Sequence, residues 1–273
     1  MSYERVYVRD RRALAYFGSA ATADFWDDRW DSDPAELARW ISTQPDSRFL
    51  PVLRARLPAG AVVLEGGCGK GHILAGMVRD GFVGVGLDFA QRTLRAIRAA
   101  RADLHLTAGD VRTLPLRDAS LDGYVSAGVI EHFWDGYGAI LDEMARTIRP
   151  GGIAVVTFPY MSPIRRLKAL LRVFRHRSAA SLEERAGSFY QFALDWRRTA
   201  ADFEARGFRV LESRPWNPFK GAMDEIAIAR GPLGRFYRGR GNRWIALVLD
   251  RVLTPLAVHE RRLVLERVAA GPR

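Results

Sequence analysis

The stretch VVLEGGCGKGH, residues 62–72, constrains the fold of this chain more than any other segment. An apolar run ends in an acid, and four glycines then stand within the six positions 66–71. The run predicts a buried strand of a parallel sheet over residues 61–65, and the apolar spacing after the glycines predicts a helix over residues 71–80. Between a strand and a helix, a glycine-rich turn lets the backbone approach a ligand beside the helix N-terminus. The stretch therefore predicts an α/β fold with a ligand site at this turn.

The spacing of the glycines argues against two common nucleotide sites. A P-loop needs Gly-x4-Gly-Lys-Ser/Thr, and no spacing here fits it. The dinucleotide pattern Gly-x-Gly-x-x-Gly fails at its third glycine, because counting on from Gly67 and Gly69 reaches His72. What remains is Glu65-x-Gly67-x-Gly69-x-Gly71. This pattern resembles the first motif of the class I S-adenosylmethionine-dependent methyltransferases.

The acid before the glycines supports this resemblance. S-adenosylmethionine carries an ammonium group and a sulfonium but no phosphate, so a carboxylate near the loop favours it, whereas a pyrophosphate would be repelled. We expect Glu65 to bind the amino group of the cofactor, directly or through water. The alternative is that Glu65 only fixes its own loop.

Further acids follow in the order that the family implies. The predicted strand 82–88 ends in Asp88, which suits ribose hydroxyls here and in dinucleotide sites alike. The block AGDVRTLPLRDASLDGYVSAGVIEHF, residues 108–133, resembles the adenine-binding acid, the fourth strand and the Glu-His segment of the family. The resemblance implies that Asp110 meets the adenine amino group and that the Val111 backbone meets a ring nitrogen. It implies further cofactor contacts at Gly66, Phe89 and Gly128.

The resemblance is strong over residues 55–160 and implies a Rossmann-like sheet of seven strands. The strands match at residues 149–159, 207–215 and, for an antiparallel seventh strand, 261–269, with helices on both faces. Two insertions, residues 160–195 after the fifth strand and residues 216–258 after the sixth, start at the ligand edge of this sheet. A mainly helical cap over the substrate is therefore expected. The expected organisation is a cap segment 1–45, a cofactor-binding core 46–159, a cap insertion 160–195, a core helix and strand six 196–215, a second cap insertion 216–258, and strand seven with the C-terminus 259–273.

The chemistry follows from the implied cofactor. A hydroxyl or carbon acceptor needs a base, and His132, just after the fourth strand, is the candidate. The alternative is that His132 only shapes the pocket. Tyr160 and Tyr190 are candidates for contact with the acceptor. Because no His, Asp and Glu cluster has metal-ligand spacing, no metal is expected.

The cap is basic, and the formal net charge of the chain is +11. A helix is predicted over residues 162–177, with Arg165, Arg166 and Lys168 in a positive rim, and residues 230–243 add five arginines. Three explanations stay open: a packed helix with a solvated basic face, contact with an anionic membrane or lipid-like acceptor, and nucleic acid. The last is disfavoured, because neither insertion resembles an RNA-binding module.

The predicted activity is transfer of a methyl group to oxygen, nitrogen or carbon of a small-molecule or lipid-like acceptor, an activity of the kind found in specialised metabolism. The alternative is a protein that binds the cofactor but has a non-methylating or regulatory role. Cys68 is the single cysteine, so no intrachain disulfide can form, and no apolar run reaches the roughly 20 residues that cross a bilayer. The predicted location is the cytoplasm, with peripheral membrane contact as the alternative.

Overall fold

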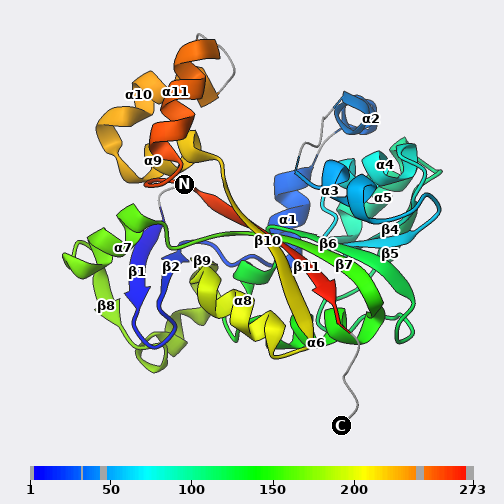
Figure 1. Cartoon of the computed structure of the whole chain (residues 1–273), viewed down its shortest axis with the longest axis horizontal. Coiled ribbons are helices and arrows are strands. Elements are labelled where there is room, and N and C mark those ends of the chain that lie inside the picture. The colour runs from blue at the N-terminus through cyan, green and yellow to red at the C-terminus, as the bar shows by residue number, and fades with distance from the viewer. Residues whose placement is uncertain (1–2, 32, 44–47, 238–242, 269–273) are drawn as a thin grey trace. The chain divides into compact units, whose positions relative to one another are not determined.

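The computed structural model describes residues 3–31, 33–43, 48–237 and 243–268 (Figure 1). The chain divides into two compact units. The core unit comprises Ala21–Val156, Ala200–Glu212 and Leu263–Arg273, and the accessory unit comprises Met1–Ala20, Thr157–Thr199 and Ser213–Arg262. Of the arginine-rich stretch 230–243, residues 238–242 lie outside the described residues.

A seven-stranded sheet has the strand order β10-β11-β7-β6-β3-β4-β5. β3 pairs in parallel with β4 and β6, and β4 pairs in parallel with β5. The predicted seven strands, with an antiparallel seventh strand β11, are confirmed. β7 and β10 continue from the core unit into the accessory unit, and β11 continues from the accessory unit into the core unit. The strands are β3 (Val62–Gly66), β4 (Val83–Asp88), β5 (His105–Ala108), β6 (Leu121–Ala127), β7 (Ile148–Pro159), β10 (Phe208–Trp216) and β11 (Glu260–Arg267).

Amphipathic helices bury the faces of the core strands. α5 turns Thr93, Leu94 and Ile97 inward, at the spacing of one helix face. The core they join also contains Val63 of β3 and Leu74 of α4. The helices of the core unit are α1 (Ala23–Trp30), α2 (Pro34–Thr43), α3 (Leu50–Arg56), α4 (His72–Arg79), α5 (Gln91–Ala100), the short 3-10 helix η1 (Ile130–His132) and α6 (Gly138–Thr147). A further helix, α8 (Trp196–Glu204), begins in the accessory unit and ends in the core unit.

The N-terminal segment 1–45, expected as one piece of cap, is shared between the units. α1 and α2 belong to the core unit, where Leu37 and Ile41 of α2 pack into the main hydrophobic core. The residues before them form β1 (Glu4–Val8) and β2 (Ala13–Phe17), an antiparallel hairpin of the accessory unit. Whether any part of this segment covers a substrate stays a prediction.

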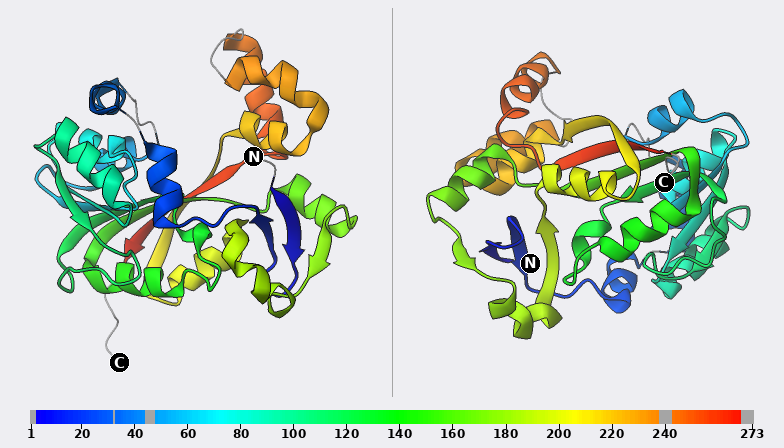
Figure 2. Two further views of the ribbon diagram at one scale, coloured as in Figure 1. Left: turned by 180° about the vertical axis from the view of Figure 1, so that it is seen from behind. Right: turned by 60° about the horizontal axis from the view of Figure 1, so that its bottom comes forward.

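The accessory unit contains a second sheet, with the order β8-β1-β2-β9 (Figure 2). β1 pairs in parallel with β8 (Arg175–Arg177), and β2 pairs antiparallel with β9 (Phe189–Ala193). The prediction of a mainly helical cap did not include this sheet. The rest of the unit is helical, with α7 (Pro163–Leu170), η2 (Ala180–Ser188), α9 (Pro218–Glu225), η3 (Ala227–Ala229), α10 (Arg230–Tyr237) and α11 (Arg243–Leu253).

The prediction of one helix over residues 162–177 was wrong. α7 ends at Leu170, Arg172 has a φ of 54°, and the chain continues into β8. The apolar spacing that suggested a longer helix includes Phe174, which is indeed buried, but from the bend directly before β8 rather than from a helix. Pairing with β1 thus outweighs the local helical pattern.

Candidate functional site

The glycine loop between β3 and α4 has a backbone conformation that glycine adopts more readily than other residues. Gly67, Gly69 and Gly71 have φ values of 75°, 47° and 73°, in the left-handed region that disfavours side chains. A Cβ at Gly67 would lie 2.5 Å from Cγ2 of Val129, which no real Cβ tolerates. The loop is therefore fixed in a shape that a larger residue would disrupt.

Glu65 is the last residue but one of β3, and its side chain is buried, at 1% exposed. Its Oε2 accepts a hydrogen bond of 2.8 Å from the backbone N–H of Leu74, in the first turn of α4. An acid beside a helix N-terminus is stabilised by the unpaired amides there. The carboxylate thus joins the strand to the helix across the glycine loop, which is the loop-fixing role considered as the alternative from the sequence. Whether it also meets the cofactor's amino group stays a prediction.

Asp88, the last residue of β4, holds the loop from the other side. Its Oδ2 accepts from Gly69 N at 2.8 Å, and its Oδ1 accepts from Ala90 N at 2.9 Å. Burial raises the pKa of Asp88, although the hydrogen bonds from Ala90, Gly69 and Phe89 oppose the shift. The Asp88 carboxylate therefore lies beside the glycine loop at the carboxyl end of a parallel strand, where ligands bind in sheets of this kind.

The residues expected at the adenine lie after β4 and β5. Arg112 donates to both carboxylate oxygens of Asp110, and these hydrogen bonds lower the pKa of Asp110. Val111 is buried, and Phe89 is 42% exposed. Gly128, after β6, has a φ of 70°. At the end of β3, a Cβ at Gly66 would lie 2.0 Å from the Tyr124 hydroxyl oxygen.

His132 lies in η1, and two tryptophans that the sequence analysis did not select are close to the site. The Trp26 ring meets the His132 ring edge-on at 5.1 Å and stacks on Trp30 at 5.5 Å. A Cβ at Gly69 would lie 3.6 Å from the Trp30 ring. In the sequence, the run DFWDDRW, residues 24–30, indicates a helix with an aromatic face, but no neighbouring residue indicates which part of the fold that face packs against.

Asp27 fixes α1, and hence both tryptophans, in this place. Its Oδ1 accepts from the backbone N–H and the hydroxyl of Thr93, and its Oδ2 accepts from the backbone N–H of Arg92. Burial alone would raise the pKa of Asp27, but these hydrogen bonds outweigh it and leave the pKa lowered. The ionised carboxylate therefore anchors α1 to the first turn of α5.

The core unit thus brings together the loop glycines, Glu65, Asp88 and His132. Burial, with the charges of Glu65 and Asp88, holds the pKa of the Cys68 thiol well above its usual range, so Cys68 is an unreactive part of the loop. In the described ranges, no group of three or more His, Cys, Asp or Glu side chains is arranged to hold a metal ion.

Tyr160 and Tyr190 belong to the accessory unit. Tyr160 is 4% exposed, and the Arg261 guanidinium lies over its ring at 5.2 Å. Tyr190 stacks on Tyr3 at 4.6 Å. Both rings are therefore engaged within this unit, and contact with an acceptor stays a prediction.

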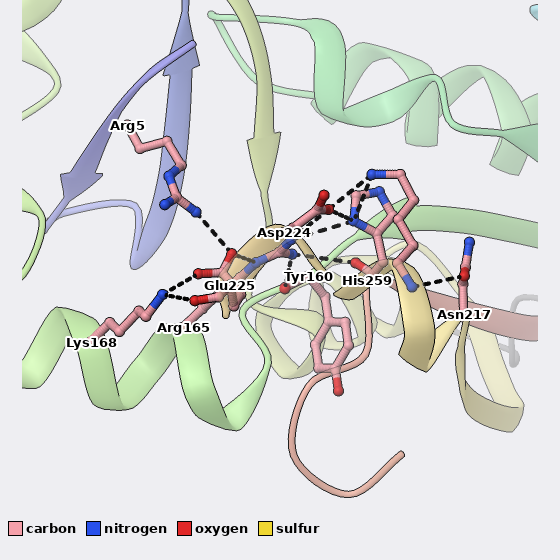
Figure 3. Close-up of polar contacts among 9 residues, drawn as sticks. Arg5, Tyr160, Arg165, Lys168, Asn217, Asp224, Glu225 and His259 are labelled. Carbon is pink, nitrogen blue, oxygen red and sulfur yellow. Dashed lines mark hydrogen bonds and ion pairs between the residues drawn. The ribbon is translucent and has the colours of Figure 1, made fainter. Parts of the chain in front are cut away.

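The predicted positive rim of Arg165, Arg166 and Lys168 was wrong. Arg165 is 0% exposed and pairs with Glu225 at 2.9 Å, and Lys168 binds the same carboxylate at 3.0 Å (Figure 3). Arg166 pairs with Asp195 at 3.0 Å. All three charges of α7 are thus neutralised by acids.

Glu225 is the centre of this buried network. Arg5 of β1 adds a third cation at 3.0 Å from its carboxylate (Figure 3). Burial alone would raise the pKa of Glu225, but the attraction of Arg165 and the other cations outweighs burial. The pKa is therefore lowered and the carboxyl stays ionised. Arg165 also donates to the backbone oxygens of Tyr160 and His259. The network joins β1, α7 and α9 to the turn before β11, which is a structural role.

Comparison with known proteins identifies the family. A model described as a methyltransferase domain matches residues 64–156. A probable S-adenosylmethionine-dependent methyltransferase of Mycolicibacterium smegmatis is 32% identical over 179 residues, which cover 58% of this chain and 68% of the relative. This chain belongs to the S-adenosylmethionine-dependent methyltransferases. The family explains why the glycine loop is flanked by acids rather than by phosphate-binding cations.

Other relatives of this methyltransferase share a smaller part of their length. An uncharacterized methyltransferase of Mycobacterium sp. strain JLS is 36% identical over 46% of this chain and 51% of its own. A malonyl-acyl-carrier-protein O-methyltransferase of Pseudescherichia vulneris is 31% identical over 55% of this chain and 54% of its own. The chain thus spans about half the length of these two relatives.

Solved structures share the fold at low identity. A putative Haloferax volcanii methyltransferase, in complex with the activator Trm112, superposes with a TM-score of 0.56 at 20% identity, covering 92% of this chain and 97% of that one. A Haemonchus contortus phosphoethanolamine N-methyltransferase with S-adenosylhomocysteine gives 0.54 at 16%, covering 94% and 62%. The cyclase SpnF gives 0.51 at 16%, covering 93% and 99%. These likenesses establish the methyltransferase fold and no acceptor.

Proposed function

We propose that this methyltransferase transfers the methyl group of S-adenosylmethionine to a small-molecule or lipid-like acceptor. The observation that carries the proposal is the set of acids around the loop. Glu65 near the end of β3, Asp88 at the end of β4 and Asp110 after β5 lie at the carboxyl ends of three neighbouring strands, beside glycines with positive φ. Acids suit a ligand with an ammonium group, a sulfonium and hydroxyls, and they repel a pyrophosphate. The residues present therefore fit this cofactor.

Each residue has a proposed task. Glu65 binds the ammonium group while it holds Leu74 N, and Asp88 accepts from the ribose hydroxyls while it holds the loop. Asp110 and the Val111 backbone bind the adenine amino group and a ring nitrogen. Gly66, Gly67, Gly69, Gly71 and Gly128 let the backbone lie against the cofactor, and Phe89, partly exposed, packs on the adenine. When bound, the cofactor supplies a methyl group on a positively charged sulfur.

On the acceptor side, we propose His132 as the base. Its side chain is 10% exposed and lies 3.9 Å from Oε1 of Glu131, so the imidazole is held in a largely dry environment beside Trp26. A neutral imidazole removes the proton of a hydroxyl or an activated carbon as the methyl is transferred. Trp26 excludes water from this side, which keeps the transferred group from solvent.

The test uses S-adenosylmethionine with a deuterated methyl group. The protein is incubated with small-molecule, lipid and RNA extracts, and products are detected by mass spectrometry. Labelled small molecules or lipids support the proposal, and His132→Ala is expected to lower their formation by about 10²–10⁴ without changing cofactor affinity. Label in RNA alone would overturn the acceptor class. Cofactor binding with no labelled product in any extract would favour the alternative, a non-methylating or regulatory protein.

A further inference from the structure

The turn that follows α7 exposes an unusual group of apolar side chains. Leu170, Leu171 and Val173 are 78%, 66% and 63% exposed, and Leu167 on the same helix is 53% exposed. Together with Arg172 between them, residues 170–173 form what we call the α7–β8 tip. Contiguous exposed apolar side chains on a protein surface mark an interaction site more often than chance.

The backbone holds the α7–β8 tip in one shape. Val173 N donates to Lys168 O at 2.9 Å and Arg172 N donates to Ala169 O at 3.0 Å, the two hydrogen bonds of a Schellman motif. Arg172 takes the left-handed position with a φ of 54°, where glycine is the usual residue because other L-residues are disfavoured. The arginine at this position places a positive charge within the apolar group.

The segments on both sides anchor the tip. Phe174 is 5% exposed, and the Arg5 guanidinium lies over its ring at 5.2 Å. β8 follows at once and pairs with β1 through Val6–Arg175 and its neighbours. The exposure of Leu170, Leu171 and Val173 is therefore a property of a fixed turn between a helix and a strand.

Around the tip, exposed arginines outnumber acids. Arg172, Arg175 and Arg177 are exposed, and in the part of the chain that the structure describes none of them forms an ion pair. The sequence has no acid between Tyr160 and Leu182. The other cations of α7 are all taken up by Glu225 and Asp195. The excess of positive charge therefore lies beside the apolar tip, although Glu4 offsets part of the charge of Arg175.

A second apolar surface lies in the same unit. α11 exposes Trp244, Val248 and Val252 at 78%, 62% and 55%. Its one acid is Asp250, and tryptophan is enriched where proteins meet the interface of a bilayer. No described helix is both long and apolar enough to cross a membrane.

We propose that the accessory unit binds the surface of an anionic bilayer through the α7–β8 tip. Leu170, Leu171 and Val173 enter the boundary between headgroups and acyl chains, and the three arginines bind lipid phosphates. The charge of the tip favours an anionic bilayer over a second copy of this chain as its binding partner. A second copy of this chain would bring the same arginines and a net charge of +11 against the tip, whereas an anionic bilayer complements both features.

The test is co-sedimentation of the full chain with vesicles of phosphatidylcholine alone or mixed with phosphatidylglycerol. Binding is expected only with the anionic lipid and is expected to weaken from low to physiological salt. Each arginine near such a surface contributes about fivefold to partitioning, so the triple variant Arg172→Gln, Arg175→Gln, Arg177→Gln is expected to bind about 10²-fold more weakly. The matched control carries Gln at three exposed arginines of the core unit, namely Arg39, Arg95 and Arg117.

A second variant tests the apolar part. Leu170→Ser with Leu171→Ser is expected to abolish binding at physiological salt while leaving thermal unfolding and S-adenosylhomocysteine affinity unchanged. Those two measurements separate this proposal from the proposed methyl transfer and from misfolding. Equal binding to both vesicle types, an equal effect of the control variant, or loss only when Trp244 is replaced would overturn it. So would a dimer in solution that the serine variant dissociates, because the tip would then bind a second copy.

Discussion

Replacing Glu65 with glutamine separates its two proposed tasks. The side chain is buried, and Oε2 accepts from Leu74 N at 2.8 Å. Glutamine keeps a carbonyl oxygen for this N–H, so a charge-assisted hydrogen bond becomes a neutral one. The expected loss of stability is about 1 kcal/mol, the difference between those two kinds of bond. For a chain of this size that lowers Tm by about 2–4 °C.

The effect on cofactor binding is expected to be larger. Without its negative charge, residue 65 loses a charged hydrogen bond to the ammonium group, worth about 1.5–3 kcal/mol. Because 1.4 kcal/mol is tenfold in Kd, the affinity for S-adenosylhomocysteine should fall by about tenfold or more.

Calorimetry with two ligands shows whether Glu65 binds the ammonium group or only fixes the loop. S-adenosylhomocysteine contains the amino acid part, whereas 5′-methylthioadenosine lacks it. Glu65→Gln is expected to weaken only the first, and the control Asp88→Asn is expected to weaken both, since both contain the ribose. An equal loss for the two ligands in Glu65→Gln would show that Glu65 acts only through the loop and would refute the ammonium assignment.

Three further predictions concern Asp88, Gly67 and Glu225. Cofactor binding needs the ionised form of Asp88, so the affinity is full above the pKa of Asp88 and is lost as the pH falls through it. Because burial raises that pKa, the loss should begin at a higher pH than for an ordinary aspartate. If the affinity of the unmodified protein depends on pH in the same way as that of Asp88→Asn, which cannot ionise, the prediction is contradicted. Gly67→Ala places a Cβ 2.5 Å from Val129 and should lower stability by more than the control Gly60→Ala, which has a φ of 78° but no atom within 4 Å of its Cβ; equal melting temperatures would count against the loop geometry. Glu225→Gln leaves Arg165 buried without its carboxylate and should cost about 3–5 kcal/mol in urea unfolding, against about 0–1 for Asp118→Asn in the exposed pair with Arg146; a small loss at Glu225 would mean that the network contributes little.

The sequence specified most of the core because its signals there are local. The apolar run before Gly66 and the acid that ends the next strand, Asp88, indicate a parallel sheet and its ligand edge without knowledge of distant residues. The strand ends differ from the predicted ones by one or two residues, as expected where the boundary depends on pairing with a neighbour.

The accessory unit could not be predicted in the same way. Arg165 has the spacing of a surface residue on an amphipathic helix, and only the fold brings its partner Glu225, 60 residues away, into contact with it. The pairing of β8 with β1 likewise depends on a strand at the other end of the chain. Trp26 approaches His132 because Asp27 binds Thr93, a contact that no local pattern encodes.

The central claim is that the glycine loop and its acids hold S-adenosylmethionine. Titration calorimetry of the full chain with S-adenosylhomocysteine tests it most directly. We predict one site with a micromolar Kd, about −8 kcal/mol, which Asp88→Ala weakens by an order of magnitude or more. Undetectable binding, an affinity unchanged in Asp88→Ala, or tight binding of NAD in its place would contradict the account.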